Sequence, residues 1–313
     1  MSQFVEQPLA LLGFIGERDG TAGNARLQRI LEMRADYLMT RMRDQSNPED
    51  HPHAAWLLGS KFKGAGDIFG LSYAANTLSE EEYKEALMAK LLVPLTPGDQ
   101  LECRVCDASE RLLMPTYHCL SCRAMSAQKI RRHDEIVRAL DKYIKRVHPG
   151  AVSSTNPTFG DAQGLACDLQ VTANGTTWYI DVGITSGVTK ECLPSISLQP
   201  TTNPNLESTL FDPDLPARRY QAKKTYKYRT VAEHLRIKIT PLIWLDTGRP
   251  GPNVIEFRKI IENLNEEEGE RYGDAWVEFS REVVRHTSKF IAQARKVGRL
   301  NLRRRPTDGR IEN

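Results

Sequence analysis

This chain of 313 residues is 40% hydrophobic and 27% charged, with a formal net charge of only +3, which is an ordinary balance for a globular protein. Its length allows one large core and smaller accessory parts, because domains usually contain about 100 to 200 residues. No apolar run approaches the roughly 18 residues of a membrane span, and residues 1–12 lack the pattern of a secretory signal, so we expect an intracellular protein outside any membrane.

Two helices are predicted in an N-terminal region that spans residues 1–100. Apolar residues recur at near-helical spacing over 26–42 and predict an amphipathic helix there. A second helix is expected over 79–92, since Ser79 and Glu82 have the spacing of a capping box, in which each side chain bonds the backbone N–H of the other residue. We therefore expect this region to be helical.

Four of the six cysteines lie close together in residues 101–127, the segment predicted to be a small zinc knuckle. Its candidate ligands are Cys103, Cys106, His118 and Cys122. Three thiolates and one imidazole suit tetrahedral zinc at a structural site, and metal binding would fold a segment too short to build its own core. The sequence leaves open whether Cys119 replaces the adjacent His118 as fourth ligand. The alternative is a set of buried thiols without metal, although packing alone rarely gathers cysteines beside a histidine.

Residues 128–265 alternate between helical and strand-like patterns. Helices are expected over 134–148, 217–235 and 253–264, and strands over 166–173, 176–185 and 236–245. A polar loop rich in Ser, Thr, Asn, Pro and Gly is predicted between the first helix and the first strand, through Gly164. The order α-β-β-α-β-α predicts an α/β domain with a mixed sheet.

The last region, residues 266–313, is predicted to hold a C-terminal helix and a basic tail. The helix is expected over 273–297, where an amphipathic pattern suits packing against the preceding domain or, alternatively, a partner protein. After it come three arginines, Arg303 to Arg305, and a polar tail that we expect to be flexible.

Positive charge is concentrated in three stretches, 129–132, 218–229 and 295–305. Local concentrations of Lys and Arg attract phosphate groups, so nucleic acid is the expected partner. A basic stretch on a helix is often only a solvated face, and this alternative stays open for 218–229.

Two aspartates are expected to face one another across a hairpin. Asn174-Gly175 predicts a two-residue turn, which would place Asp168 opposite Asp181 on the side of the sheet away from the buried apolar residues. Directly opposed like charges destabilise a sheet, and a divalent cation such as Mg²⁺ or Mn²⁺ between the carboxylates would remove the repulsion. The alternative is a pair of solvated aspartates that nearby lysines relieve.

Three further residues are candidates for a metal-dependent hydrolytic site. Lys224 and Lys227 lie three residues apart and therefore on one helix face, where they would orient a water molecule or stabilise phosphoryl oxygens. Glu135, in the first turn of the predicted helix 134–148, would complete the metal shell or act as a base. The alternative for Glu135 is a glutamate that the positive end of the helix dipole favours.

Taken together, these motifs resemble the C-terminal part of non-LTR retrotransposon polyproteins, in which a zinc knuckle precedes a restriction-like endonuclease of the PD-(D/E)XK superfamily. The resemblance spans residues 69–263. Besides the Cys/His cluster and the two aspartates, with twelve residues between them, it depends on Arg132-His133 at the opening of a helix and on Lys224-Thr225-Tyr226-Lys227-Tyr228, which resembles a K-x-x-K-Y helix. The chain departs from the family in three places. It has Cys167 where a proline usually precedes the first aspartate, a narrower spacing between His118 and Cys122, and Gly183 where the superfamily has a lysine.

The resemblance implies a restriction-endonuclease-like core with a small zinc knuckle and flanking helices. It implies a Mg²⁺- or Mn²⁺-dependent DNA endonuclease with structural Zn²⁺, because in the elements that this chain resembles the nuclease nicks target DNA and a reverse transcriptase extends the freed 3′ hydroxyl. The expected partners are DNA, element RNA and a reverse transcriptase as partner or fusion, and the expected location is the nucleus. The alternative is a catalytically inactive DNA- or RNA-binding module of the same ancestry.

Overall fold

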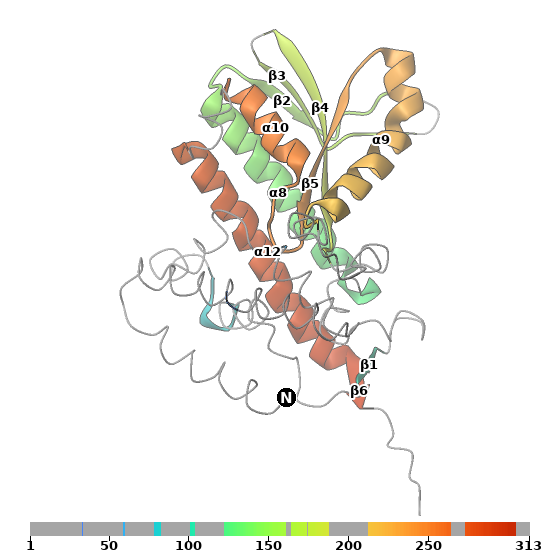
Figure 1. The fold of residues 1–313 in the computed structure, drawn as a ribbon, viewed down its shortest axis with the longest axis vertical. Helices are drawn as coiled ribbons and strands as arrows, with labels where there is room; N and C mark the ends of the chain where they lie inside the picture. Colours follow the sequence, from blue (N-terminus) through green and yellow to red (C-terminus); the bar gives the residue numbers. More distant parts are fainter. Residues whose placement is uncertain are drawn as a thin grey trace, which may run out of the picture.

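The computed structural model confirms a mixed α/β architecture, with helices on both faces of a four-stranded sheet (Figure 1). It describes Met33, Gly59 and residues 78–82, 101–103, 122–160, 164–173, 175–187, 212–263 and 273–304. Four predicted features therefore lie outside the described residues, in whole or in large part: most of the helix over 26–42, residues 83–92 of the helix over 79–92, the zinc candidates Cys106, His118 and Cys119, and the end of the tail. No helix among the described residues is long and apolar enough to cross a membrane.

The sheet has the strand order β2-β3-β4-β5. Its strands are β2 (Val152–Thr155), β3 (Leu169–Ala173), β4 (Thr176–Thr185) and β5 (Ile239–Leu245). The first three pair antiparallel, whereas β5 runs parallel to β4. Three strands match the predicted ones, but β2 lies in the stretch that was predicted to be a loop. That prediction was wrong because a short, largely exposed edge strand shows little apolar alternation, and it forms through pairing with β3.

The predicted hairpin register is confirmed. Leu169 pairs with Ile180 and Ala173 with Thr176, which leaves a two-residue connection between β3 and β4. Gly175 in that connection has a φ of +73°, a conformation that glycine adopts without steric cost. The register therefore follows from the turn, as the sequence indicated.

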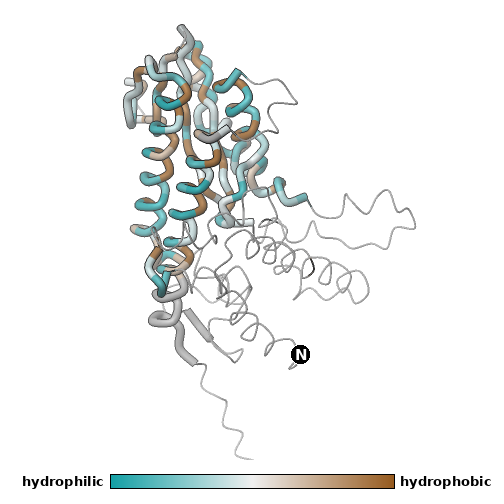
Figure 2. The backbone as a smooth tube through the Cα atoms, turned by 90° about the vertical axis from the view of Figure 1, so that its left-hand side faces the viewer, coloured by the Kyte–Doolittle hydropathy of each residue, from teal (hydrophilic) through white to brown (hydrophobic). Residues whose placement is uncertain are grey.

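One face of the sheet is covered by three helices, α8 (Ser126–Val147), α10 (Pro252–Ile261) and α12 (Asp274–Asn301). Their apolar side chains and those of β3, β4 and β5 form the larger buried cluster, and Figure 2 shows hydrophobic and hydrophilic residues alternating along the helices. The other face is covered by α9 (Leu215–Leu235), through a smaller cluster centred on Ala217 and Ile243. The main hydrophobic core therefore lies between the sheet and α8, α10 and α12.

The C-terminal helix α12 belongs to the same core. The ring of Phe279 stacks on Tyr143 of α8 at a centroid distance of 5.1 Å, and Trp276 meets Tyr143 edge-on at 5.6 Å. Beyond α12, β6 (Leu302–Arg304) pairs antiparallel with β1 (Leu101–Cys103), so Arg303 and Arg304 lie in a short strand where a basic tail was expected. This pairing brings Cys103, the first zinc candidate, beside the end of α12.

The predicted capping box is present at the start of the helix that includes residues 80–82. The N–H of Ser79 donates to Oε2 of Glu82 at 3.0 Å, and the N–H of Glu82 donates to Oγ of Ser79 at 3.2 Å. Two backbone donors that the helix itself cannot satisfy are thereby paired.

A buried ion pair joins α8 to the end of β5. Nη1 of Arg132 donates to Oδ1 of Asp246 at 2.8 Å, and the two side chains are only 5% and 4% exposed. The guanidinium also lies 3.9 Å from the ring centroid of Phe290 in α12. Arg132 therefore anchors the helix turn that carries His133 to both β5 and α12.

We predict that Asp246→Ala lowers the free energy of unfolding by about 3 to 5 kcal/mol, because it leaves the buried charge of Arg132 without a partner. Glu233→Ala is the control, since it breaks an exposed ion pair with Arg229 on α9 and should cost less than about 1 kcal/mol. Urea unfolding of both variants measures the difference. Equal, small losses would contradict a structural role for the buried pair.

Candidate functional site

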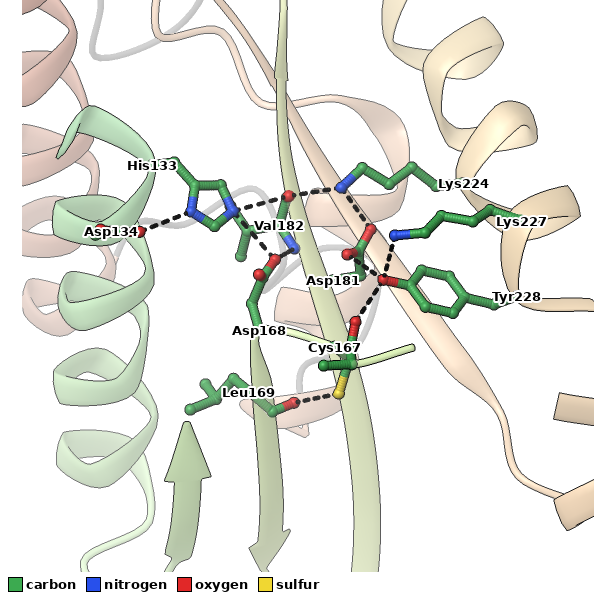
Figure 3. A network of polar contacts seen from close by, with 11 residues as sticks. His133, Asp134, Cys167, Asp168, Leu169, Asp181, Val182, Lys224, Lys227 and Tyr228 are labelled. Atoms are coloured by element: carbon green, nitrogen blue, oxygen red, sulfur yellow. Dashed lines mark hydrogen bonds and ion pairs between the residues drawn. The ribbon is translucent and has the colours of Figure 1, made fainter. Parts of the chain in front are cut away.

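The candidate site lies at the start of β3, where β4 extends beyond its pairing with β3. The last pair of the antiparallel ladder is Leu169 with Ile180, whereas β4 pairs with β5 through to Thr185. From Asp181 onward, one edge of β4 is therefore met by side chains instead of a strand. Figure 3 shows these side chains arriving from α8 on one side and α9 on the other.

Asp168 occupies the position just before β3. Its N–H donates to the carbonyl of Ile180 at 3.0 Å, and its Oδ2 accepts the N–H of Val182 at 2.6 Å. The carboxylate thus provides the acceptor that a neighbouring strand would otherwise provide, which satisfies a backbone donor inside the fold. Asp168 is fixed by this bond at the peptide group that follows Asp181.

Asp181 is 3% exposed and faces α9. Its Oδ1 accepts a hydrogen bond from the hydroxyl of Tyr228 at 2.8 Å. Its Oδ2 lies 2.7 Å from Nζ of Lys224 in an ion pair, yet this buried oxygen has no partner of hydrogen-bond geometry among the described residues. A buried carboxylate oxygen in this state is a potential ligand for a cation.

The two carboxylates converge on the Asp181–Val182 peptide, but they do not face each other as a cross-strand pair. The predicted register holds through Leu169 and Ile180 and breaks at Asp168, whose N–H bonds Ile180. In Figure 3, Asp168 lies on the α8 side of Val182 and Asp181 on the α9 side. The expectation that both share one face of the sheet is corrected accordingly.

The carbonyl oxygen of Val182 is contacted by the side chains of Lys224 and His133. Nζ of Lys224 donates to it at 3.1 Å, and Nε2 of His133 lies 3.3 Å away. Lys224, predicted as a site residue, thus contacts both this carbonyl and Asp181, with its own side chain only 16% exposed. The lysine bridges two oxygen atoms that could equally ligate a metal ion.

His133 is the residue that the sequence prediction left out of the site, although the Arg132-His133 pair was noted as a motif. Its Nε2 lies 3.1 Å from Oδ2 of Asp168, and its Nδ1 lies 3.2 Å from Oδ1 of Asp134. The hydrogen bond to Asp168 raises the pKa of His133 above its ordinary value, against the opposing effect of burial. With acceptors at both ring nitrogens, the doubly protonated imidazolium is the form that this environment favours.

Lys227, the second predicted lysine, reaches Asp181 only through Tyr228. Its Nζ donates to the hydroxyl of Tyr228 at 3.1 Å and lies 4.6 Å from the centroid of that ring. Burial and then the charge of Asp181 raise the pKa of Tyr228, so the phenol stays neutral and remains a hydrogen-bond donor. Lys227 therefore contributes charge next to the site without touching either carboxylate.

Gly183 lies where α9 packs closely on the sheet, with little room for a side chain. A Cβ at this position would lie 2.5 Å from Cδ1 of Ile243 and 2.7 Å from Cε1 of Tyr220. The close approach of α9 to the sheet thus requires glycine at this position, and the same approach carries Lys224 to Asp181.

The structure places Glu135 away from the cluster. One carboxylate oxygen lies 3.2 Å from Arg138 and the other 4.0 Å from Nε2 of His286 on α12. Residues two positions apart on an α-helix differ in direction by about 200° around its axis, so Glu135 and His133 face different neighbours. Its proposed part in the metal shell is not supported by these contacts.

Cys167, which precedes Asp168, is buried, and its Sγ lies 3.6 Å from the carbonyl of Leu169. Burial raises the pKa of this thiol to about 11, so it remains a neutral thiol near pH 7. Cys167 therefore adds neither a charge nor a thiolate nucleophile beside the carboxylates.

The oxygen atoms at this site suit a hard divalent cation. Within the described part of the chain, no group of three or more His, Cys, Asp or Glu side chains is arranged to hold a metal ion. Mg²⁺, however, is commonly bound through one or two carboxylates together with water and substrate phosphates. Asp168, Asp181 and the carbonyl of Val182 offer oxygen atoms of this kind.

Comparisons with known proteins add no family for this chain. No model of a known protein family matches it, and a search of curated proteins finds no match. Function is therefore inferred from the geometry of the site.

We predict that His133 titrates above its ordinary pKa of 6.5 in metal-free protein, and that Asp168→Asn returns it toward that value. A raised pKa means that the stabilising contact is fully present below pH 6.5 and is lost as the pH rises through the raised value. An NMR titration of the His133 ring protons measures both. Asp141→Asn, elsewhere on α8, is the control and should leave the midpoint unchanged. A midpoint at or below 6.5 in the native protein would contradict the role assigned to Asp168.

Proposed function

We propose that this chain is a divalent-metal-dependent DNA endonuclease with a restriction-like core, of the type found in retroelements. The observation that carries this proposal is the gathering of oxygen atoms around Val182 of β4, where Asp168 accepts the Val182 N–H, Asp181 immediately precedes it, and Lys224 contacts both Asp181 and the Val182 carbonyl. Charged and polar oxygens gathered in this way are what metal-assisted hydrolysis of a phosphodiester requires.

The order of elements supports the same proposal. The helix α8, the hairpin of β3 and β4, the helix α9 and the parallel strand β5 follow one another as expected for the restriction-like core, with β2 as an added edge strand. The first carboxylate precedes the first strand of the hairpin, and the second lies within the next strand. Lys224 of α9, which contacts Asp181, would supply the positive charge that the superfamily has at the position of Gly183.

A bound Mg²⁺ or Mn²⁺ would supply an activated water molecule and neutralise charge on the phosphate. The site's own residues then have separate tasks. Asp168 and Asp181 hold the cation, while Tyr228 fixes the orientation of Asp181 through its hydrogen bond. Lys224 and His133 provide positive charge on the α9 and α8 sides, where they would contact the phosphoryl oxygens of the strand being cut. Water forms a bond to phosphorus, the bond to the 3′ oxygen breaks, and that oxygen takes a proton.

The zinc knuckle is proposed as a structural partner of this site. Cys122, its last candidate ligand, is 4% exposed and immediately precedes the 3-10 helix η3 (Arg123–Met125), which leads into α8. Zn²⁺ bound by Cys103, Cys106, His118 or Cys119, and Cys122 would thus steady the start of the helix that carries His133. Element RNA, a reverse transcriptase and a nuclear location are proposed on the resemblance alone.

A DNA- or RNA-binding module without cleavage is the second candidate function. One observation favours it: Lys224 already neutralises Asp181 at 2.7 Å, so the site is electrostatically balanced without a metal ion. In that case the site would be a structural charge cluster, and the basic helix α9 would carry the function.

We predict that the native protein nicks supercoiled plasmid in the presence of Mg²⁺ or Mn²⁺ and that Asp181→Ala abolishes nicking. Lys224→Ala should reduce the rate about 100-fold, the cost typical of losing one charge-stabilising donor. Lys227→Ala should reduce it less, since Lys227 contacts Tyr228 and not a carboxylate.

Glu233→Ala, an exposed substitution on α9, is the control for folding and should cleave at the native rate. All proteins are prepared identically and compared by circular dichroism. Nicking that persists in Asp181→Ala would sink the proposed site. A native protein that binds DNA but never cleaves it would favour the binding module.

A further inference from the structure

Tyr226 lies on α9 with its side chain in solvent. It is 76% exposed, although Tyr228, two residues further on, is only 1% exposed. Residues two apart lie on nearly opposite sides of a helix, so Lys224 and Tyr228 face the candidate site while Tyr226 faces outward. Single exposed apolar side chains are common on protein surfaces, and exposure alone therefore indicates nothing.

Tyr226 is surrounded on the surface of α9 by positively charged residues. The helix α9 contains six Lys and Arg residues but only one acidic residue, Glu233. Lys223 and Lys227 lie three residues before and one after Tyr226, and both are exposed, as is Arg219 one turn earlier. This outward surface of α9, made of Arg219, Lys223, Tyr226 and Lys227, is called the basic aromatic face below.

The basic aromatic face is continuous with the candidate site. Lys227 is an exposed residue, yet its Nζ donates to the hydroxyl of Tyr228, which in turn bonds Asp181. Figure 3 shows Lys227 beside Lys224 at the α9 side of the site. Lys227 lies about 100° around the helix axis from Tyr226, so a strand whose phosphate lay at Asp181 would pass Lys227 and then follow the surface of α9 to reach Tyr226.

The combination of aromatic ring and cations selects one kind of nucleic acid. Phosphates pair with Lys and Arg in any strand, but a tyrosine ring stacks only on a base whose face is uncovered. In a duplex the base faces are stacked on one another, and only their edges are accessible. An exposed ring within a row of cations is consequently suited to an unpaired strand.

We propose that the basic aromatic face binds single-stranded DNA, with Tyr226 stacked on an unpaired base of a strand that reaches this face past Lys227 from the phosphate held at the candidate site. The position of that phosphate rests on the proposed function, whereas the stacking does not. The enzyme would accordingly prefer DNA that is already opened, such as a duplex next to a single-stranded segment.

The test is the affinity of the full-length protein for short labelled oligonucleotides, measured by fluorescence anisotropy with EDTA present so that nothing is cut. Tyr226→Ala should weaken binding of single-stranded DNA about tenfold, because stacking on an aromatic side chain contributes roughly this factor per base. Binding of a blunt duplex should change less than about twofold. Tyr226→Phe should keep native affinity, since the ring and not the hydroxyl makes the stack.

Ile260→Ala is the matched control, because Ile260 is 50% exposed on α10, which covers the other face of the sheet. It should leave both affinities unchanged. Equal weakening of single strand and duplex by Tyr226→Ala, or no weakening of either, would overturn the inference. So would an effect confined to an RNA strand of the same sequence. A plasmid cleavage assay on the same preparations separates the nuclease proposal from the proposed binding of single-stranded DNA. If the native protein does not cleave plasmid, only the nuclease proposal is contradicted.

Discussion

The start of β3 at Leu169 is the constraint on which the rest of the site depends, because β4 beyond Ile180 has no β3 partner and the Asp181–Val182 peptide therefore lies at an unpaired edge inside the fold. A backbone donor in that position needs an acceptor, and the carboxylate of Asp168 provides it at 2.6 Å. The carbonyl of Val182 likewise needs donors, and Lys224 and His133 meet it from opposite sides of the strand. The need of one residue, Val182, for partners at both its N–H and its carbonyl thus gathers the residues that would do the chemistry.

Charge balance explains why both helices are needed. Asp181 is buried, and a buried carboxylate is costly unless it is paired, so Lys224 must come close to it. That approach is possible because Gly183 leaves room for Tyr220 of α9 against the sheet. On the other side, Asp168 meets His133, whose helix is anchored through the buried pair of Arg132 and Asp246. Lys224 and His133 therefore balance the charge of the two carboxylates. A cation bound at the carboxylates, or a phosphate group bound at Lys224 and His133, would contact residues that are already paired with one another.

Much of the fold could be predicted from the sequence, because periodicity and turn residues act locally. The register of the hairpin follows from a two-residue turn, and the helices and three of the four strands follow from their apolar spacing. The remaining features depend on packing. An edge strand such as β2 carries almost no pattern of its own, and the sharing of a site between His133 and Lys224 arises only when α8 and α9 cover opposite faces of the sheet. Glu135 illustrates the same limit, since its direction around α8 takes it to His286.

The most direct test of the account is Mn²⁺ binding to zinc-saturated protein, followed by electron paramagnetic resonance. We expect one Mn²⁺ site that excess Mg²⁺ displaces, and we expect it to be lost in both Asp168→Asn and Asp181→Asn, because each removes one of the two carboxylates next to Val182. Asp141→Asn, on the exterior of α8, should bind as the native protein does. Undiminished Mn²⁺ binding by both site variants would contradict the claim that these carboxylates form a cation site.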